Sequence, residues 1–276
     1  MTRRKVAVDG SAACAAVVHG SPPAGGLAAI TDRLLRELHP LRFGAPVTHV
    51  YNPLLYARAP YDLYLGRFGQ GPKQTLLIGM NPGPWGMVQT GVPFGDVGEV
   101  RDWLGIEAPI GGPEFPHPRR PVEGFACRRR EGSGRRVWGW ARRRFGSPER
   151  FFSRFFVANY CPLAFFEAGG ANRTPDRLPA ASREPLFSAC DRALVQTVEE
   201  LRPRHVFGFG RFAAERAAAA LAGCGITVGR IPHPSPASPA ANRGWEALID
   251  AVLEGHGVAV GREGQASTAS RAEPAG

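Results

Sequence analysis

The sequence predicts an α/β protein built on a mainly parallel, four-stranded sheet, and three observations lead to this prediction. Four short apolar runs alternate with stretches of helical periodicity along the chain. One of them, RHVFGFG at residues 204–210, passes through a glycine turn into a helix, and such a strand–helix unit favours parallel pairing. Several runs end in loops rich in Asn, Gly and Pro, and an open α/β sheet binds ligands at that end of its strands.

The four predicted strands have clear stop signals. Pro82, Gly83 and Pro84 forbid continuation of the first strand beyond Met80 and Asn81. The strands are predicted at residues 76–78, 151–157, 204–210 and 226–231. Helices are predicted from apolar periodicity at residues 27–39, 97–104, 184–201, 212–222 and 245–254, with a short extended piece at 47–52 and a loop at 109–121.

The chain of 276 residues is long enough for one large α/β domain with tails. We expect a domain at residues 26–257. Residues 1–25, rich in Gly, Ala and Pro, and residues 258–276, polar and small, are expected to be disordered. The apolar runs are too short to cross a bilayer, so no membrane partner is expected.

The charge of the chain indicates a polyanionic partner. The formal net charge is +10, and nearly all of the cationic charge is arginine because Lys5 and Lys73 are the only lysines. Nucleic acid is the leading candidate for the partner. The alternative is that an Arg- and Ala-rich composition reflects a GC-rich genome.

The cysteines favour an intracellular, reducing setting, which is cytoplasm or nucleoid in a bacterium and nucleus in a eukaryote. Their number is odd, they are widely separated, and no C-x-x-C pair occurs. This pattern predicts neither a disulfide framework nor a closely spaced zinc or iron–sulfur site. A weak apolar stretch interrupted by Asp9 and Gly10 argues against a secretory signal.

Polar side chains follow three of the predicted strands. Asn81, Asn159 and His233 each stand beyond the carboxyl end of a separate strand, and a parallel sheet brings these ends to one edge. Taken singly, Asn81 is more simply explained as a helix-capping residue in a turn, and His233 as a capping or packed histidine in a Pro-rich turn. Because no G-x-S-x-G, H-E-x-x-H or P-loop motif is present, acyl hydrolases, zincins and NTPases are disfavoured.

Residues 128–144 form the most basic segment, with eight arginines, one acidic residue and two tryptophans. Basic residues interleaved with aromatic ones suit a surface that follows a phosphate backbone, with Arg142, Arg143 and Arg144 as candidate contacts. A solvated charged helix with Trp138 and Trp140 turned inward is the other interpretation.

Four motifs together resemble one known family. They are GMNPGP at residues 79–84, GVPFG at 91–95, NYCPL at 159–163 and HPSP at 233–236 followed by NRGWE. Their order and spacing are similar to those of the single-strand-selective monofunctional uracil-DNA glycosylases, in the uracil-DNA glycosylase superfamily, over residues 27–255. The resemblance implies a three-layer α/β/α fold and a metal- and cofactor-free DNA repair enzyme. Such an enzyme flips uracil from single- or double-stranded DNA and hydrolyses its glycosidic bond, leaving an abasic site.

The resemblance also implies roles for residues of the catalytic and base-reading motifs. Asn81 would position the attacking water, and His233 would hydrogen-bond uracil O2 and stabilise the anionic leaving base. Asn159 would read the Watson–Crick edge of uracil, and Phe94 would stack on its ring.

The resemblance also implies roles for two further segments, the loop that contains Met80 and Gly83 and the stretch at residues 234–244. The Met80 backbone would line the pocket, and Gly83 would leave open space near C5, which permits 5-hydroxymethyluracil and other C5-oxidised uracils. The stretch 234–244 would be a wedge that enters the duplex. The wedge contains the candidate DNA contacts Pro234, Ser235, Pro236, Ala237, Asn242 and Arg243. Ala237 departs from the family pattern, in which this position is typically basic.

Two alternatives stay open at this point. One is a superfamily relative acting on deaminated purines such as hypoxanthine or xanthine. The other is a catalytically silent nucleic-acid-binding module, which the joint presence of Asn81, Asn159 and His233 disfavours. A monomer with DNA as its partner is expected.

Overall fold

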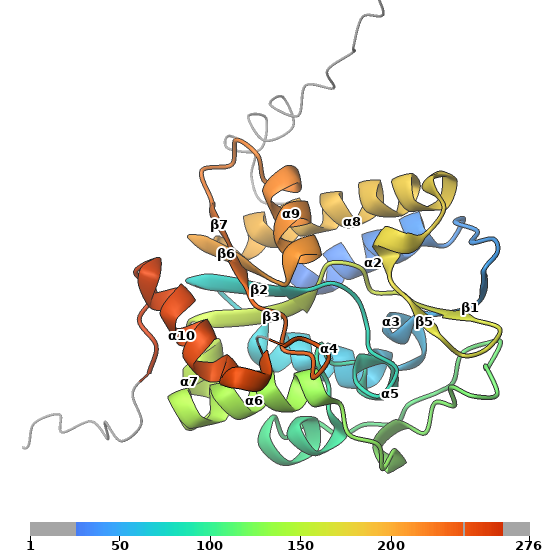
Figure 1. The fold of residues 1–276 in the computed structure, drawn as a ribbon, viewed down its shortest axis with the longest axis horizontal. Helices are drawn as coiled ribbons and strands as arrows, with labels where there is room; N and C mark the ends of the chain where they lie inside the picture. Colours follow the sequence, from blue (N-terminus) through green and yellow to red (C-terminus); the bar gives the residue numbers. More distant parts are fainter. Residues whose placement is uncertain (1–25, 240, 262–276) are drawn as a thin grey trace, which may run out of the picture.

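The protein has a central four-stranded sheet in which every neighbouring pair of strands is parallel (Figure 1). The computed structural model describes residues 26–239 and 241–261. The strand order is β3-β2-β6-β7, with β2 at Thr75–Gly79, β3 at Phe155–Asn159, β6 at His205–Phe209 and β7 at Thr227–Ile231. The predicted mainly parallel, four-stranded sheet is confirmed.

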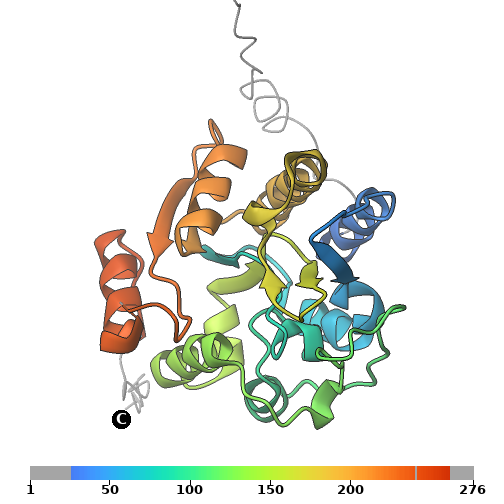
Figure 2. The same cartoon turned by 45° about the vertical axis from the view of Figure 1, so that its right-hand side comes forward.

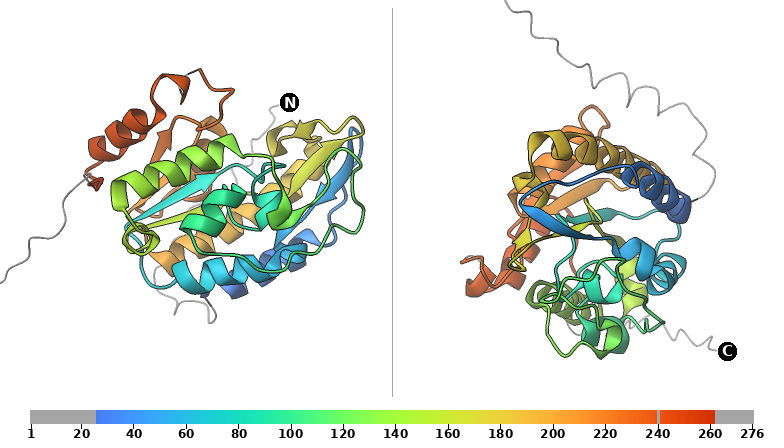
Figure 3. Two further views of the ribbon diagram at one scale, coloured as in Figure 1. Left: turned by 90° about the horizontal axis from the view of Figure 1, so that it is seen from below. Right: turned by 90° about the vertical axis from the view of Figure 1, so that its right-hand side faces the viewer.

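Helices cover both faces of this sheet, which gives the expected three layers (Figures 1 and 3). One outer layer contains α2 (Gly26–Leu38), α8 (Ala180–Leu201) and α9 (Arg211–Ala220); the other contains α6 (Gly132–Phe145), α7 (Pro148–Phe152) and α10 (Trp245–Gly255). Shorter elements complete the chain: α3 (Pro53–Tyr56), α4 (Arg58–Phe68), α5 (Met87–Thr90) and the single turns Glu99–Trp103, Gly124–Ala126, Pro175–Arg177 and Ala241–Arg243. No helix in the described ranges is long and apolar enough to span a membrane.

A second, antiparallel sheet lies beside the first and was not predicted (Figure 2). It has the order β1-β4-β5, with β1 at Val47–Tyr51, β4 at Ala164–Glu167 and β5 at Asn172–Arg173. Only β1 corresponds to a predicted extended piece. The strands β4 and β5 are four and two residues long, which is too short for an alternating pattern to identify them.

The predicted strand at residues 151–157 was wrong in its first half. Phe151 and Phe152 belong to α7, and β3 begins only at Phe155. Ser147 caps α7 by accepting a hydrogen bond from the Arg150 N–H at 3.3 Å, and Pro148 occupies its first turn. These are ordinary start signals for a helix, and they override the apolar run that follows.

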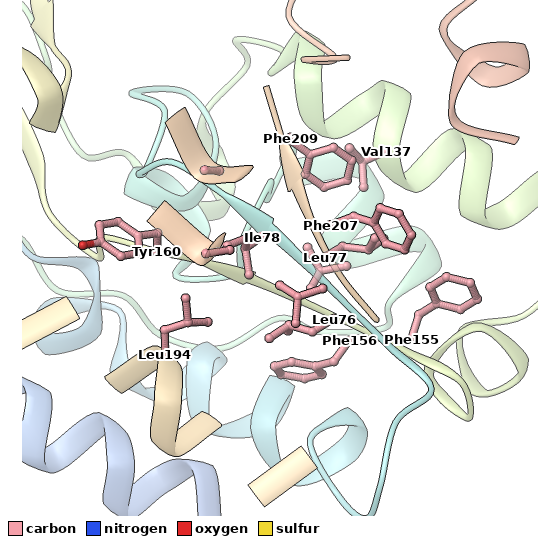
Figure 4. Close-up of a cluster of buried hydrophobic side chains, with 14 of the residues drawn as sticks. Leu76, Leu77, Ile78, Val137, Phe155, Phe156, Tyr160, Leu194, Phe207 and Phe209 are labelled. Atoms are coloured by element: carbon pink, nitrogen blue, oxygen red, sulfur yellow. The ribbon is translucent and has the colours of Figure 1, made fainter. Parts of the chain in front are cut away.

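The core is continuous through the layers and rich in aromatic side chains. Figure 4 shows side chains of β2, β3 and β6 packed together, among them Leu76, Leu77 and Phe207. On α6, Trp138 and Trp140 are fully buried, so the inward alternative is correct for the two tryptophans. Their indole N–H groups donate to Phe94 O at 3.0 Å and to Asp250 Oδ1 at 2.8 Å, respectively.

The predicted domain end needs a small correction. The structure describes the chain as far as residue 261, and Val258 is fully buried, with its N–H bonded to Leu253 O at 2.9 Å. The ordered part therefore extends past residue 257. Residues 1–25, and residues 262–276 of the tail predicted at 258–276, lie outside the described residues.

Gly208, near the end of β6, has a packing role. A Cβ at Gly208 would lie 2.5 Å from the Ala213 carbonyl carbon and would also overlap the Ala214 backbone. Helix α9 therefore packs directly on the β6 backbone, and only glycine permits this approach.

We predict that Gly208→Ala lowers the free energy of unfolding by about 3 kcal/mol or more, because α9 must move away from the sheet. Urea denaturation would measure the loss. The matched control is Gly66→Ala in α4, where a Cβ meets nothing within 4 Å. That change should be neutral or stabilising by about 0.5–1 kcal/mol. Equal stability of the two variants would contradict the packing role of Gly208.

Candidate active site

A pocket of about 270 Å³ lies at the carboxyl ends of the parallel strands. The three residues predicted to share a site, Asn81 after β2, Asn159 at the end of β3 and His233 after β7, all line it. Met80, Gly83 and Phe94 line it as well. The structure therefore brings together every base-pocket residue that the sequence predicted.

The Asn81 side chain is held in one orientation. Its Nδ2 donates a hydrogen bond to Leu163 O at 3.2 Å. The carboxamide oxygen is thus left as an acceptor for a ligand or a water. Because a carboxamide does not take up a proton at neutral pH, this group can orient a water molecule but cannot act as its base.

Gly79 allows two other side chains to meet over the end of β2. A Cβ at Gly79 would lie 2.5 Å from Asn159 Oδ1 and 2.7 Å from Phe94 Cζ. Asn159 pairs with Gly79 in the parallel register of β2 and β3. Its Nδ2 donates to Met87 Sδ at 3.1 Å, a weak acceptor, so one N–H and the amide oxygen are available to a ligand.

Phe94 adopts a backbone conformation that non-glycine residues rarely take, with φ of 55°. Its carbonyl oxygen accepts hydrogen bonds from Trp138 Nε1 at 3.0 Å and from the Asp96 N–H at 2.8 Å. The ring packs edge-to-face on Phe209, with centroids 5.0 Å apart. These contacts hold the strained residue so that its ring forms one wall of the pocket.

His233 presents a neutral imidazole to the pocket. Its Nδ1 accepts a hydrogen bond from the Ser235 N–H at 3.0 Å, so the ring proton is on Nε2. Burial lowers the pKa of His233 below its ordinary value of 6.5. The side chain is therefore a neutral N–H donor at physiological pH.

The wedge stretch is tied to α6 through Arg136, a residue that the sequence analysis did not select. Arg136 donates to Pro234 O at 2.9 Å and to Asn242 Oδ1 at 2.8 Å, and Asn242 in turn donates to Pro236 O at 2.9 Å. Ser235 reaches the base pocket, whereas Pro236, Ala237 and Arg243 are exposed on the surface.

The three arginines predicted as phosphate contacts are all paired with carboxylates. On α6, Arg142 pairs with Glu99, Arg143 with Glu246 and Arg144 with Asp250. Two of them nevertheless line a basic groove of about 420 Å³ between α6 and the wedge. This α6 groove is lined by Glu99, Gly132, Arg135, Arg136, Gly139, Arg142, Arg143 and Pro236.

The pocket also contains residues that sequence reasoning missed. Glu131, Ser133, Asn172 and Thr174 line it. Glu131 caps α6, a position that the E-G-S-G sequence could have indicated, but its place within a run of arginines suggested a solvated side chain. Asn172 and Thr174 carry no signal, since they follow the unpredicted strand β4. Within the described residues, no group of three or more His, Cys, Asp or Glu side chains could hold a metal ion.

We predict that His233 makes folding stability depend on pH. Because the pKa of His233 is lower in the folded protein than its ordinary 6.5, the unfolded chain binds more protons as the pH falls below that value. The contribution is complete above about pH 6.5 and is lost as the pH falls toward the folded pKa. Urea unfolding at pH 7.5 and 5.5 should show a smaller loss in His233→Gln than in the parent. The same loss in both proteins would assign the effect to other groups, such as His205.

Comparison with known proteins gives a consistent result. Residues 67–253 match the family described as the Uracil DNA glycosylase superfamily. The chain is 51% identical over 217 residues to the single-strand selective monofunctional uracil DNA glycosylase of Mus musculus, covering 78% of each chain. It is also 51% identical to the corresponding proteins of Rattus norvegicus, over 216 residues, and Bos taurus, over 218 residues, which cover 78% and 80% of those chains.

A solved structure shows the same fold. The crystal structure of wild-type SMUG2 from Pedobacter heparinus matches with a TM-score of 0.58 and 17% identity, covering 83% of this chain and 97% of that one. At this identity the likeness concerns the fold alone. On the sequence matches, the chain belongs to the uracil DNA glycosylase superfamily and, within it, to the single-strand selective monofunctional uracil-DNA glycosylases.

Proposed function

We propose that this enzyme removes uracil from DNA with Asn81, Asn159 and His233 as its principal catalytic and base-reading residues. The observation that carries the proposal is that these three side chains, from three different strand ends, line one pocket. A base flipped out of the DNA stack would enter this pocket.

Asn159 and His233 recognise complementary parts of the uracil ring. The Asn159 amide oxygen accepts from N3–H, and its free N–H donates to O4. Cytosine presents the opposite pattern at these two positions, so it is rejected. His233 donates its Nε2 proton to O2, and Phe94 stacks on the ring.

The reaction needs no proton transfer from the enzyme to begin. The C1′–N1 bond breaks, its electron pair stays on the base, and the hydrogen bond from neutral His233 stabilises the negative charge that develops on O2. A water held by the Asn81 amide oxygen adds to C1′ and releases a proton to solvent, and the uracil anion takes up a proton from solvent to become the neutral base. The products are the free base and an abasic site in an intact strand.

The pocket leaves space on the side of the ring that neither Asn159 nor His233 contacts. A Cβ at Gly83 would be 3.6 Å from its nearest neighbour, Glu131 Oε1. A glycine at this position therefore leaves room for a substituent on C5. We include 5-hydroxymethyluracil and other C5-oxidised uracils among the substrates.

The DNA path follows the wedge and the α6 groove. The wedge residues Pro234, Ser235, Pro236, Ala237, Asn242 and Arg243 fill the space left by the flipped base, and the groove arginines contact phosphates. Arg142 and Arg143 would exchange a carboxylate for a phosphate, and Arg144, on the same helix, is a further candidate contact. Both single- and double-stranded DNA are substrates, and an exposed Ala237 makes wedge insertion weaker than a basic residue would.

A single copy of the chain supplies the pocket, the wedge and the groove, and we propose that it acts as a monomer. We also propose that it acts inside the cell, in the cytoplasm or nucleoid of a bacterium or in the nucleus of a eukaryote, where its DNA substrate would be found. No cofactor has a part in this mechanism.

The enzyme should be monofunctional, because strand cleavage through a Schiff base needs an amine in the pocket. Lys73 is the one lysine among the described residues, and it precedes β2, whereas the pocket lies beyond the other end of that strand. Its Nζ is buried and donates to Phe152 O at 2.7 Å.

We expect a labelled uracil oligonucleotide to be cut only after hot alkali treatment, with full activity in EDTA and no borohydride-trapped adduct. Asn81→Ala should slow the single-turnover rate by about 100-fold or more while binding persists, because Asn81 acts on the water in the transition state. Strand breaks before alkali, a trapped adduct, or inhibition by EDTA would overturn the monofunctional mechanism. A parental rate in Asn81→Ala would remove Asn81 from it.

We also predict that Arg135→Ser weakens DNA binding and reduces the slope of log affinity against log salt by about one. Arg135 lines the α6 groove and forms no ion pair within the described residues, so it is free to release a counterion from the DNA. The control is Arg36→Ser on α2, an exposed residue in the opposite layer that changes the net charge equally. Equal slopes for the two variants would place the phosphate path elsewhere.

A further inference from the structure

Glu131 is a carboxylate in the wall of the base pocket, and the proposed mechanism does not use it. It stands at the N-terminus of α6, where one oxygen, Oε2, accepts a hydrogen bond from the Gly134 N–H. The other oxygen, Oε1, points toward Gly83 and would lie 3.6 Å from a Cβ there. A Cβ at Gly86 would lie 2.7 Å from Glu131 Cγ. The glycines of this loop thus make room for the Glu131 side chain.

Capping a helix with this carboxylate has an unfavourable desolvation free energy, because the charged group is largely removed from water. Burial raises the pKa of Glu131, opposed by the N–H groups of Gly134 and Ser133, and nearby Asp96 raises it further. Glu131 forms no ion pair with any cation in the described part of the chain. A serine or aspartate would cap α6 equally well with less side chain to bury. The longer side chain has the effect of placing an acceptor oxygen beside Gly83.

The orientation of the base follows from the proposed function, on which this inference rests. With O2 at His233 and the N3–O4 edge at Asn159, the C5–C6 edge faces the remaining wall of the pocket. That wall contains Pro82, Gly83, Gly86 and Glu131. A substituent on C5 therefore extends toward the space between Gly83 and Glu131.

We propose that Glu131 determines specificity at C5 by accepting a hydrogen bond from a hydroxyl group on the C5 substituent. Gly83 leaves space for a substituent on C5, and the Glu131 carboxylate favours substituents that can donate a hydrogen bond to it. A 5-hydroxymethyl group donates its O–H to the carboxylate. A 5-methyl group cannot donate to the half-buried carboxylate, and the oxygen of a 5-formyl group repels it. Glu131 thus favours 5-hydroxymethyluracil over thymine and over 5-formyluracil.

The test compares two variants that change the reach or the charge of the acceptor. Glu131→Asp keeps a good N-cap for α6 but withdraws the carboxylate from Gly83. Glu131→Gln keeps the length and loses the charge. The specificity constant kcat/KM is measured for uracil, 5-hydroxymethyluracil and 5-formyluracil, each placed in the same oligonucleotide. We expect the ratio for 5-hydroxymethyluracil over uracil to fall by about 10-fold to 100-fold in Glu131→Asp, and by less in Glu131→Gln.

A matched control separates specificity from stability. Ser147→Ala removes the cap of α7, outside the pocket, and should lower the Tm without changing the substrate ratio. The Tm of Glu131→Asp should stay close to that of the parent.

Three outcomes would overturn the role of Glu131. In the first, the substrate ratio is unchanged in both Glu131 variants, whether or not their overall rates fall, so that Glu131 serves only structure or the shared chemical step. In the second, the parent enzyme does not act on 5-hydroxymethyluracil. In the third, the parent prefers 5-formyluracil and loses that preference in Glu131→Asp, which would make Glu131 a protonated donor. Failure of the proposed function is distinct, because the parent would then release no uracil at all.

Discussion

The active site depends on the absence of a side chain at Gly79. The β2 strand lies between β3 and β6, so its carboxyl end is surrounded by the segments that supply the pocket residues. A Cβ at this point would lie 2.7 Å or less from both the Phe94 ring and the Asn159 amide. Because Gly79 has no side chain, the Phe94 ring and the Asn159 amide occupy this space together, which lets them form adjoining walls of the pocket that is proposed to hold the base.

The site and its surroundings carry less unpaired positive charge than the net charge of +10 suggests. Burial lowers the pKa of His233, so in the proposed mechanism this residue stabilises the developing anion by donating a hydrogen bond and not by its own charge. Several arginines of α6 are neutralised by carboxylates on other elements. The groove beside the wedge keeps Arg135 and Arg136, neither of which forms an ion pair within the described residues, and the proposed phosphate path runs along it.

The parallel sheet and the three polar residues at its edge could be predicted from the sequence, because each depends on local signals. A buried strand stopped by proline, as before Asn81, or by a Pro-rich turn, as at His233, is recognisable without a partner. The features that could not be predicted depend on contacts between distant segments. Glu131 looks solvated until the fold places it against Gly83, and Arg144 looks available until α10 brings Asp250 to it. The two-residue strand β5 exists only because β4 pairs with it.

Helix α6 is a shared support for two working parts of the enzyme. Its inner face holds the Phe94 carbonyl through Trp138, and its outer face holds the wedge through Arg136. The base pocket and the wedge are therefore both attached to α6, so a shift of this helix moves both at once. A change of base selectivity that leaves the wedge undisturbed would therefore require substitutions in the Gly83 loop that do not shift α6. Conversely, a swap of α6 between relatives would exchange pocket and wedge as one module.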